Sequence, residues 1–226
     1  MAAIRAVIFG DTLREVPLVA FRIAVLASGT GTNLQAILDR LHGRDGIEVA
    51  CVASNKSGAR ALERARDAEI ETGVFERSGH PDRASRDAAI AEWLGDRDVD
   101  LIVLAGYMEL LSGEFVGRFR NRIVNVHPAL LPSFPGLDAI EQALAHGVRV
   151  TGVTVHLVDE GVDSGPIVLQ QAIEVPYTRD RAQLEEEIHR VEHELLPEAI
   201  RLIAAGAVRI DQENPRLVHV DAEASE

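Results

Sequence analysis

From Phe21 onward, short runs of branched apolar residues alternate with amphipathic stretches of helical length. The apolar runs contain few polar residues, which is typical of strands buried on both faces of a sheet. We expect strands at residues 22–27, 47–54, 72–75, 99–104 and 123–126, and helices at 33–42, 58–68, 81–94 and 112–119. Alternating strands and helices predict an α/β fold, with a doubly wound, mostly parallel (Rossmann-like) sheet flanked by helices.

The pattern changes toward the C-terminal half. After a loop at 127–137 we expect a short helix at 138–146 and then antiparallel strands at 150–158 and 167–174, joined by a glycine-containing loop. The longest helix is predicted from Asp180, an N-cap with Gln183 three residues on, to Ala205, with a kink at Pro197. A hairpin near Val208 follows.

Length and composition bound the domain organisation. The 226 residues fit one domain, which we place at 21–220, with an N-terminal extension of unknown role at 1–20 and a disordered acidic tail at 221–226. A net charge of −13 argues against a nucleic-acid partner. Charges interrupt the first 20 residues, so neither a signal peptide nor a membrane span is expected, and the single Cys51 suits the core of a cytoplasmic protein.

Three polar residues form a candidate catalytic set. Residues 125–132 read Asn-Val-His-Pro-Ala-Leu-Leu-Pro, and Asp163 lies in the later glycine-containing loop. Asn125 and His127 lie two apart on a predicted strand, so they face one side and can both donate to an oxyanion, while a carboxylate can relay a proton. A carboxylate beside His127 is expected to raise the pKa of its imidazole. The set supports acyl transfer without a metal.

Plainer interpretations of these residues stay open from spacing alone. His127 can be a core histidine bonded to backbone, and Asp163 can be a turn residue that caps its own backbone. The Leu131-Pro132 bond is a candidate cis peptide, because such bonds occur where a loop turns sharply. His156, on the strand before the Asp163 loop, either supports the site or packs in the core.

Two other motifs have competing interpretations. Residues 28–33 join a strand to a helix and contain Gly29 and Gly31, so backbone amides at the helix N-terminus can bind a phosphate. A dinucleotide fingerprint would need a glycine where Leu34 stands, and a plain structural turn is the other alternative. Residues 189–193 read His-Arg-Val-Glu-His, which fits an inverted zincin pattern and leaves a zinc hydrolase as a rival function.

Four motifs in order, at residues 28–35, 104–108, 125–132 and 151–156, followed by Asp163, resemble the folate-dependent formyltransferases over almost the whole chain from Phe21 to Val208. The resemblance implies formyl transfer from 10-formyltetrahydrofolate to the amine of glycinamide ribonucleotide in purine synthesis. It implies direct attack through a tetrahedral intermediate, with Asn125, His127 and Asp163 as catalytic residues and no metal. Members that formylate tRNA or hydrolyse formylfolate carry added domains, for which we expect this chain to be too short.

The same resemblance implies two binding regions. Gly31, Thr32 and Asn33 would hold the phosphoribosyl group, with His189 and Glu192 beside the glycinamide amine. The folate cleft would be formed by Arg83, Met108, Glu109, Leu110, Leu111, Asn125, Asp159, Glu160, Gly161, Val162 and Asp163. Partners are then small molecules, and a homodimer stays open.

One residue departs from the family pattern. Glu109 stands where the family usually has a basic residue, and an acid there cannot pair with the carboxylate tail of a folate. From sequence alone, Glu109→Arg is predicted to tighten folate binding. Arg83 can pair with that tail, although a solvated helix charge is the alternative interpretation.

Overall fold

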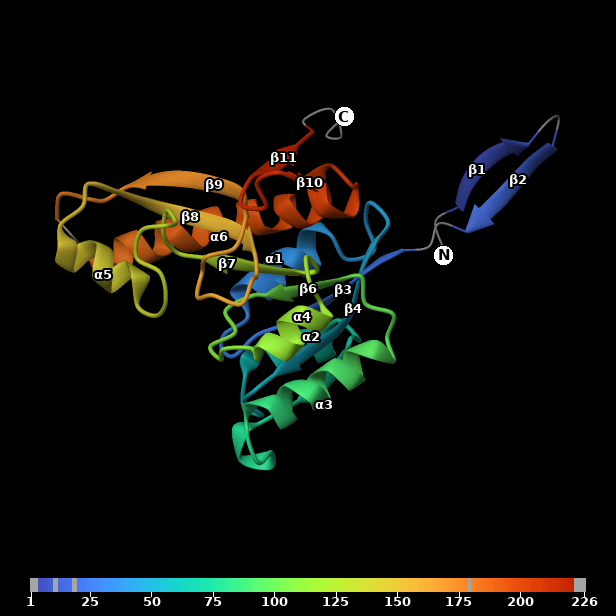
Figure 1. The fold of residues 1–226 in the computed structure, drawn as a ribbon, viewed down its shortest axis with the longest axis horizontal. Coiled ribbons are helices and arrows are strands. Elements are labelled where there is room, and N and C mark those ends of the chain that lie inside the picture. Colours follow the sequence, from blue (N-terminus) through green and yellow to red (C-terminus); the bar gives the residue numbers. More distant parts are fainter. Residues whose placement is uncertain (1–3, 10–11, 18–19, 179, 222–226) are drawn as a thin grey trace.

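The computed structural model describes residues 4–9, 12–17, 20–178 and 180–221. A seven-stranded sheet in the order β5-β4-β3-β6-β7-β8-β9 forms its centre (Figure 1). The strands β5 (Glu71–Val74), β4 (Ile47–Ser54), β3 (Phe21–Leu26), β6 (Leu101–Leu104) and β7 (Ile123–His127) are parallel, and β8 (Val150–Leu157) and β9 (Ile167–Glu174) continue the sheet in antiparallel fashion. The predicted mixed α/β sheet is confirmed.

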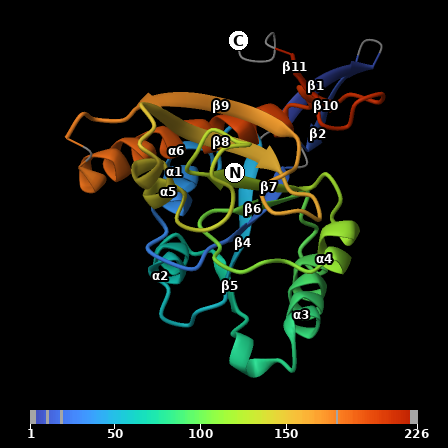
Figure 2. The same ribbon diagram turned by 60° about the vertical axis from the view of Figure 1, so that its left-hand side comes forward.

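Helices cover both faces of this sheet. They are α1 (Thr32–Arg40), α2 (Arg60–Asp67), α3 (Arg83–Gly95), α4 (Gly113–Arg118), α5 (Ala139–His146) and α6 (Arg181–Ala204). Buried residues of α1, α2 and α6 pack in one core, and those of α3 and α4 pack in the other. The rotated view of Figure 2 shows α2 and α3 on opposite sides of the strands.

The residues of β3 show why two cores form. Ile23 and Val25 belong to the core under α1, α2 and α6, whereas Ala24 and Leu26 belong to the core under α3 and α4. Successive side chains of a strand point to opposite faces, so an uninterrupted apolar strand must be covered twice. Cys51 lies in the second core, as expected, and burial raises the pKa of its thiol to about 12.

The strand order reverses beside β3, because β4 and β6 flank it on either side. In open α/β sheets the loops at the carboxyl ends of the strands diverge at such a point and leave a crevice that binds ligands. The glycine loop after β3 and the segment after β6 both leave the sheet at this edge. The fold therefore puts the predicted phosphate loop, after β3, at the same edge of the sheet as the end of the predicted catalytic strand β7, with β6 between the two strands.

Details at the ends of elements agree with local sequence signals. Asp180 caps α6 by accepting hydrogen bonds from the backbone N–H groups of Ala182 and Gln183, and α6 continues through Pro197 as one helix. The Leu131-Pro132 peptide is cis, as predicted. A short 3-10 helix, η1 (Arg77–Gly79), precedes α3 and was not predicted from the sequence.

Two short hairpins lie outside the large sheet. β10 (Val208–Ile210) pairs with β11 (Val218–Val220), which matches the hairpin expected near Val208. Within the predicted N-terminal extension, β1 (Ile4–Phe9) pairs with β2 (Thr12–Pro17) in a sheet of their own, apart from the main sheet in Figure 1. The predicted tail at 222–226 lies outside the described residues.

Candidate active site

The three candidate catalytic residues meet at the carboxyl end of β7. Asn125 and His127 lie two positions apart on β7, so their side chains point to the same face of the sheet. Asp163 comes from the loop between β8 and β9. His127 Nδ1 lies 3.3 Å from Asp163 Oδ2, and Asn125 Nδ2 lies 3.4 Å from Asp163 Oδ1. The carboxylate therefore lies between the amide and the imidazole, and the convergence expected from the sequence is present.

His156 is a fourth member of this cluster. It is the cross-strand partner of Asn125 in the β7–β8 register. His156 Nδ1 lies 2.9 Å from the carbonyl oxygen of Leu157, which can only accept, so Nδ1 carries the hydrogen. His156 Nε2 is then free to accept from Asn125 Nδ2 at 3.1 Å. His156 therefore orients the Asn125 amide, which sequence reasoning had left open between site support and core packing.

His127 is buried and bonded to backbone, two features that the core-histidine interpretation expected. It is 4% exposed, and its Nε2–H donates to the carbonyl oxygen of Phe134 at 2.8 Å. Burial lowers the pKa of His127 and outweighs the opposing effects of Asp163 and of the Phe134 carbonyl. The expected rise in pKa was wrong in direction, because desolvation penalises the imidazolium more than one carboxylate 3.3 Å away favours it.

Asp163 is held as a carboxylate. Burial acts to raise its pKa, but the His156 ring, whose Nε2 lies 3.5 Å from Oδ1, the backbone N–H of Gly136 and the nearby imidazole of His127 outweigh burial and lower it. The Gly136 N–H donates to Asp163 Oδ2 at 2.7 Å. Asp163 adopts a positive φ of 49° in its loop, and the carboxylate faces the cluster instead of capping its own turn.

The glycine loop lies against α2, and α1, which follows it, packs on α6. Gly31 has a φ of 71° and precedes the first residue of α1, and a Cβ at this position would lie 2.7 Å from Ala61 Cα. Asn33 Nδ2 donates to Glu192 Oε2 of α6 at 3.0 Å. Burial raises the pKa of Glu192, which is 6% exposed. Of the predicted ribonucleotide residues, Asn33 of α1 and Glu192 of α6 are thus in contact.

The two histidines of the zincin-like motif stack. The rings of His189 and His193 are 6.3 Å apart between centroids and nearly parallel, while the intervening Glu192 is bonded to Asn33. In the described part of the chain, no His, Cys, Asp and Glu side chains gather in a group of three or more that could hold a metal ion.

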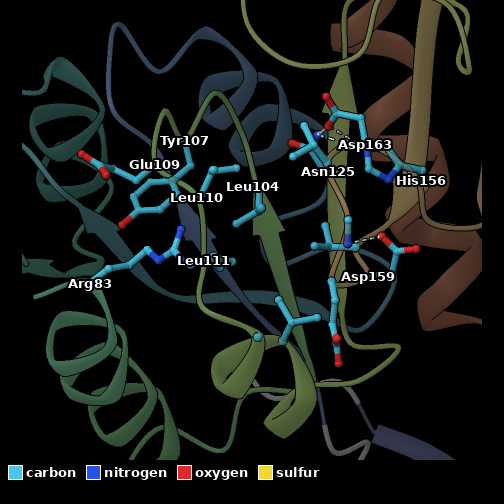
Figure 3. Close-up of a pocket in the computed structure, with 16 residues that line it drawn as sticks. Arg83, Leu104, Tyr107, Glu109, Leu110, Leu111, Asn125, His156, Asp159 and Asp163 are labelled. Carbon is cyan, nitrogen blue, oxygen red and sulfur yellow. Dashed lines mark hydrogen bonds and ion pairs between the residues drawn. The ribbon is translucent and has the colours of Figure 1, made fainter.

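A cleft of about 230 Å³ opens beside Asn125 and Asp163. Figure 3 shows Arg83, Tyr107 and Glu109 on one side of it and Asn125, His156 and Asp163 on the other. All predicted folate residues line this cleft except Met108, which lines an adjoining hollow. The cleft thus joins the catalytic cluster to the segment after β6.

Glu109 has a partner that the sequence did not reveal. Arg86 of α3 is 1% exposed, and its Nη1 lies 3.0 Å from Glu109 Oε2. The same guanidinium bonds the adjacent Asp87 at 2.8 Å, and Asp87 accepts from the backbone N–H of Ser112. A cation therefore lies beside Glu109, the residue that departs from the family pattern. This cation is the buried Arg86 of α3, which is already paired with the carboxylates of Asp87 and Glu109.

Comparisons with known proteins agree with this fold. Residues 21–200 match the family described as formyl transferase. The crystal structure of glycinamide ribonucleotide transformylase 1 from Symbiobacterium toebii has a TM-score of 0.86 and 47% identity, covering 93% of this chain and 98% of that one. The phosphoribosylglycinamide formyltransferase of Bacillus subtilis is 41% identical over 181 residues, which cover 80% of this chain and 93% of that protein.

A longer relative matches over part of its length. The trifunctional purine biosynthetic protein adenosine-3 of Bos taurus is 44% identical over 200 residues, which are 88% of this chain and 20% of that protein. The chain therefore spans about a fifth of this relative.

Fold and site define a doubly wound α/β protein with an amide, an imidazole and a carboxylate gathered at the carboxyl edge of its sheet. The chain belongs to the formyl transferase family.

Proposed function

We propose that the protein transfers the formyl group of 10-formyltetrahydrofolate to the amine of N1-(5-phosphoribosyl)glycinamide in purine synthesis. The observation that carries the proposal is the convergence of Asn125, His127 and Asp163 at one end of β7, beside a cleft and near a glycine loop. The relatives named for this reaction match the chain over most of their own length, which supports the same substrates.

In this proposal the substrate amine attacks the formyl carbon, and the carbonyl electron pair moves onto oxygen. The Asn125–Asp163 contact is long at 3.4 Å, so the developing oxyanion can take over that N–H. His127 rests neutral because burial lowers its pKa, and the negative charge of the oxyanion favours its protonation. As an imidazolium, His127 still donates its Nε2–H to the Phe134 carbonyl. Its Nδ1–H then lies between Asp163 and the oxyanion and can donate to both.

Proton movement completes the transfer. The attacking amine must lose a proton, and N10 of the folate must gain one as the carbon–nitrogen bond to the donor breaks. Asp163 is the acceptor within reach, because its lowered pKa keeps it ionised near neutral pH. Together with His127 it can pass the proton from the amine to the leaving nitrogen.

The ribonucleotide would lie between the glycine loop and α6. Backbone amides of Gly31, Thr32 and Asn33 at the start of α1 would bind its phosphate. Glu192, buried and with a raised pKa, would pair with the substrate ammonium and accept the proton that it loses to become the attacking amine. His189 lies one turn from it on the same helix.

The folate would occupy the cleft that Asn125 and Asp163 line. The loop 159–163 supplies backbone groups that can bond a pterin, while Leu104, Leu110 and Leu111 supply apolar walls. Arg83 is exposed at the cleft and can pair with the glutamate carboxylate of the cofactor.

The proposed cellular location rests on the hydropathy of the helices and on the cysteine content of the chain. No helix of the described residues is both long and apolar enough to cross a membrane. We place the reaction in the cytoplasm, because the chain has a single cysteine and that cysteine is buried. The proposal needs small-molecule substrates only.

The test follows the absorbance of the folate with and without glycinamide ribonucleotide. Consumption only when both are present indicates transfer, and consumption without the ribonucleotide indicates hydrolysis. His127→Ala and Asp163→Asn should each lower kcat at least a hundredfold while thermal unfolding stays cooperative. His219→Ala, at an exposed histidine of β11, is the matched control. Near-normal turnover in both catalytic-site variants refutes the roles, and loss of activity on chelation supports the zinc-hydrolase rival.

A further inference from the structure

The loop at residues 134–137 holds both members of the imidazole–carboxylate pair through its backbone. The carbonyl oxygen of Phe134 accepts from His127 Nε2 at 2.8 Å, and the N–H of Gly136 donates to Asp163 Oδ2 at 2.7 Å. The two contacts come from residues two positions apart. A small change in this loop therefore alters the orientation of both side chains together.

The loop conformation is not one that these residues favour by themselves. Phe134 has a φ of 54° and Asp138 a φ of 57°, both in the left-handed region that L residues rarely occupy. Gly136, with a φ of 84°, tolerates such a backbone, but an aromatic residue such as Phe134 does not favour it. Contacts from outside the loop must hold it in place.

Those contacts come from one face of α5. Gln142 Nε2 donates to the carbonyl oxygen of Leu137 at 2.8 Å and to that of Pro135 at 3.4 Å. One helical turn further on, the ring of His146 packs edge-on against the ring of Phe134, with 5.8 Å between centroids. Residues four apart on a helix share a face, so Gln142 and His146 contact the loop from the same side.

We propose that Gln142, assisted by His146, is a positioning residue for the reaction, because it holds the loop whose backbone orients His127 and Asp163. Its kinetic consequences rest on the proposed function, but the geometry does not. Gln142 touches neither the cleft nor the catalytic side chains, and it is an exposed residue of a short surface helix. A purely structural glutamine there would affect stability and nothing in the chemistry.

The experiment compares Gln142→Ala and Gln142→Glu with Glu141→Ala and Glu141→Gln. The control residue is the exposed neighbour on the same helix, where it pairs with Arg181. The Gln142 variants should lower kcat about fivefold to tenfold, while KM for both substrates changes less than twofold. The Glu141 variants should retain the kcat of the unmodified protein.

The second readout is the titration of the His127 ring, followed by NMR in the protein without substrates. Burial lowers the pKa of His127 and the Phe134 carbonyl opposes this, so losing that hydrogen bond should move the titration to lower pH in the Gln142 variants and not in the Glu141 controls. His146→Phe should preserve both kcat and titration, since an aromatic ring can still pack edge-on, whereas His146→Ala should not.

The outcomes separate the two proposals. If the Gln142 variants match the Glu141 controls in both kcat and titration, the positioning role is refuted. If the unmodified protein transfers no formyl group, the proposed function fails, yet the titration still tests whether Gln142 positions His127.

Discussion

The Arg86–Glu109 ion pair offers the sharpest test of how the folate side of the cleft is built. Arg86 is 1% exposed and Glu109 is 27% exposed, with 3.0 Å between Nη1 and Oε2. Asp87 supplies the second carboxylate at 2.8 Å. Glu109→Arg removes one of the two carboxylates and places a second guanidinium beside the buried one.

The expected cost follows from these distances. Two unit charges about 4 Å apart interact by roughly 4 kcal/mol at an effective dielectric constant of about 20. Desolvation offsets part of this, and a hydrogen bond to a charged group contributes about 1.5 to 3 kcal/mol net. We expect Glu109→Gln to lower the free energy of unfolding by about 1 to 2 kcal/mol, and Glu109→Arg by about 3 kcal/mol, because it adds repulsion to the loss.

The assay is thermal and urea unfolding of the single variants and of Arg86→Met combined with Glu109→Arg. For a chain of this size, 3 kcal/mol corresponds to a fall in Tm of about 6 to 12 °C. The double variant moves the cation from position 86 on α3 to position 109 after β6, where Asp87 is its one carboxylate partner. The double variant should therefore be more stable than the single variant Glu109→Arg.

Folate affinity should follow the same logic. The sequence alone predicted tighter binding for Glu109→Arg, but with Arg86 beside it the new guanidinium is repelled at the cleft wall. We therefore expect tighter binding only in the double variant, measured as KM for the folate. If Glu109→Arg is as stable as the unmodified protein and the two substitutions are additive, the ion pair does not matter and this reasoning is refuted.

Three further predictions concern other parts of the site. Burial lowers the folded-state pKa of His127, so the stability due to its neutral form is complete above the unfolded pKa of about 6.5 and declines as the pH falls. His127→Gln should therefore flatten the loss of unfolding free energy between about pH 7 and pH 5 in urea titrations, and an unchanged slope would contradict this. Burial raises the pKa of Glu192, so its charge costs stability as the pH rises above the unfolded pKa of about 4.3. Glu192→Gln should raise the free energy of unfolding at pH 7 by about 1 kcal/mol while weakening ribonucleotide binding, and a lower stability would count against it. Gly31→Ala should lower Tm and ribonucleotide affinity, because φ is 71° and its Cβ would lie 2.7 Å from Ala61 Cα, whereas Gly29→Ala has no atom within 4 Å and should change Tm little.

Local sequence patterns determined the order of elements and part of the site. The alternation of buried strands and amphipathic helices predicted the α/β sheet, because the hydrophobic repeat of a strand or a helix depends only on residues close together in the sequence. Strand alternation put Asn125 and His127 on one side of β7, and Asp180 was recognisable as an N-cap for the same local reason. The motifs that carry the family resemblance are likewise short and local in the sequence.

Contacts between distant segments decided the rest. The buried cation beside Glu109 comes from Arg86, 23 residues earlier, and no periodicity indicates such a pair. The tautomer of His156 depends on a carbonyl and an amide that the β7–β8 register brings together. The direction of the pKa shift at His127 depended on how deeply the fold buries it, since desolvation and a nearby carboxylate act in opposite directions. The sequence determined which groups the site contains, and only tertiary packing decided their burial, partners and charge, because those quantities depend on atoms far apart along the chain.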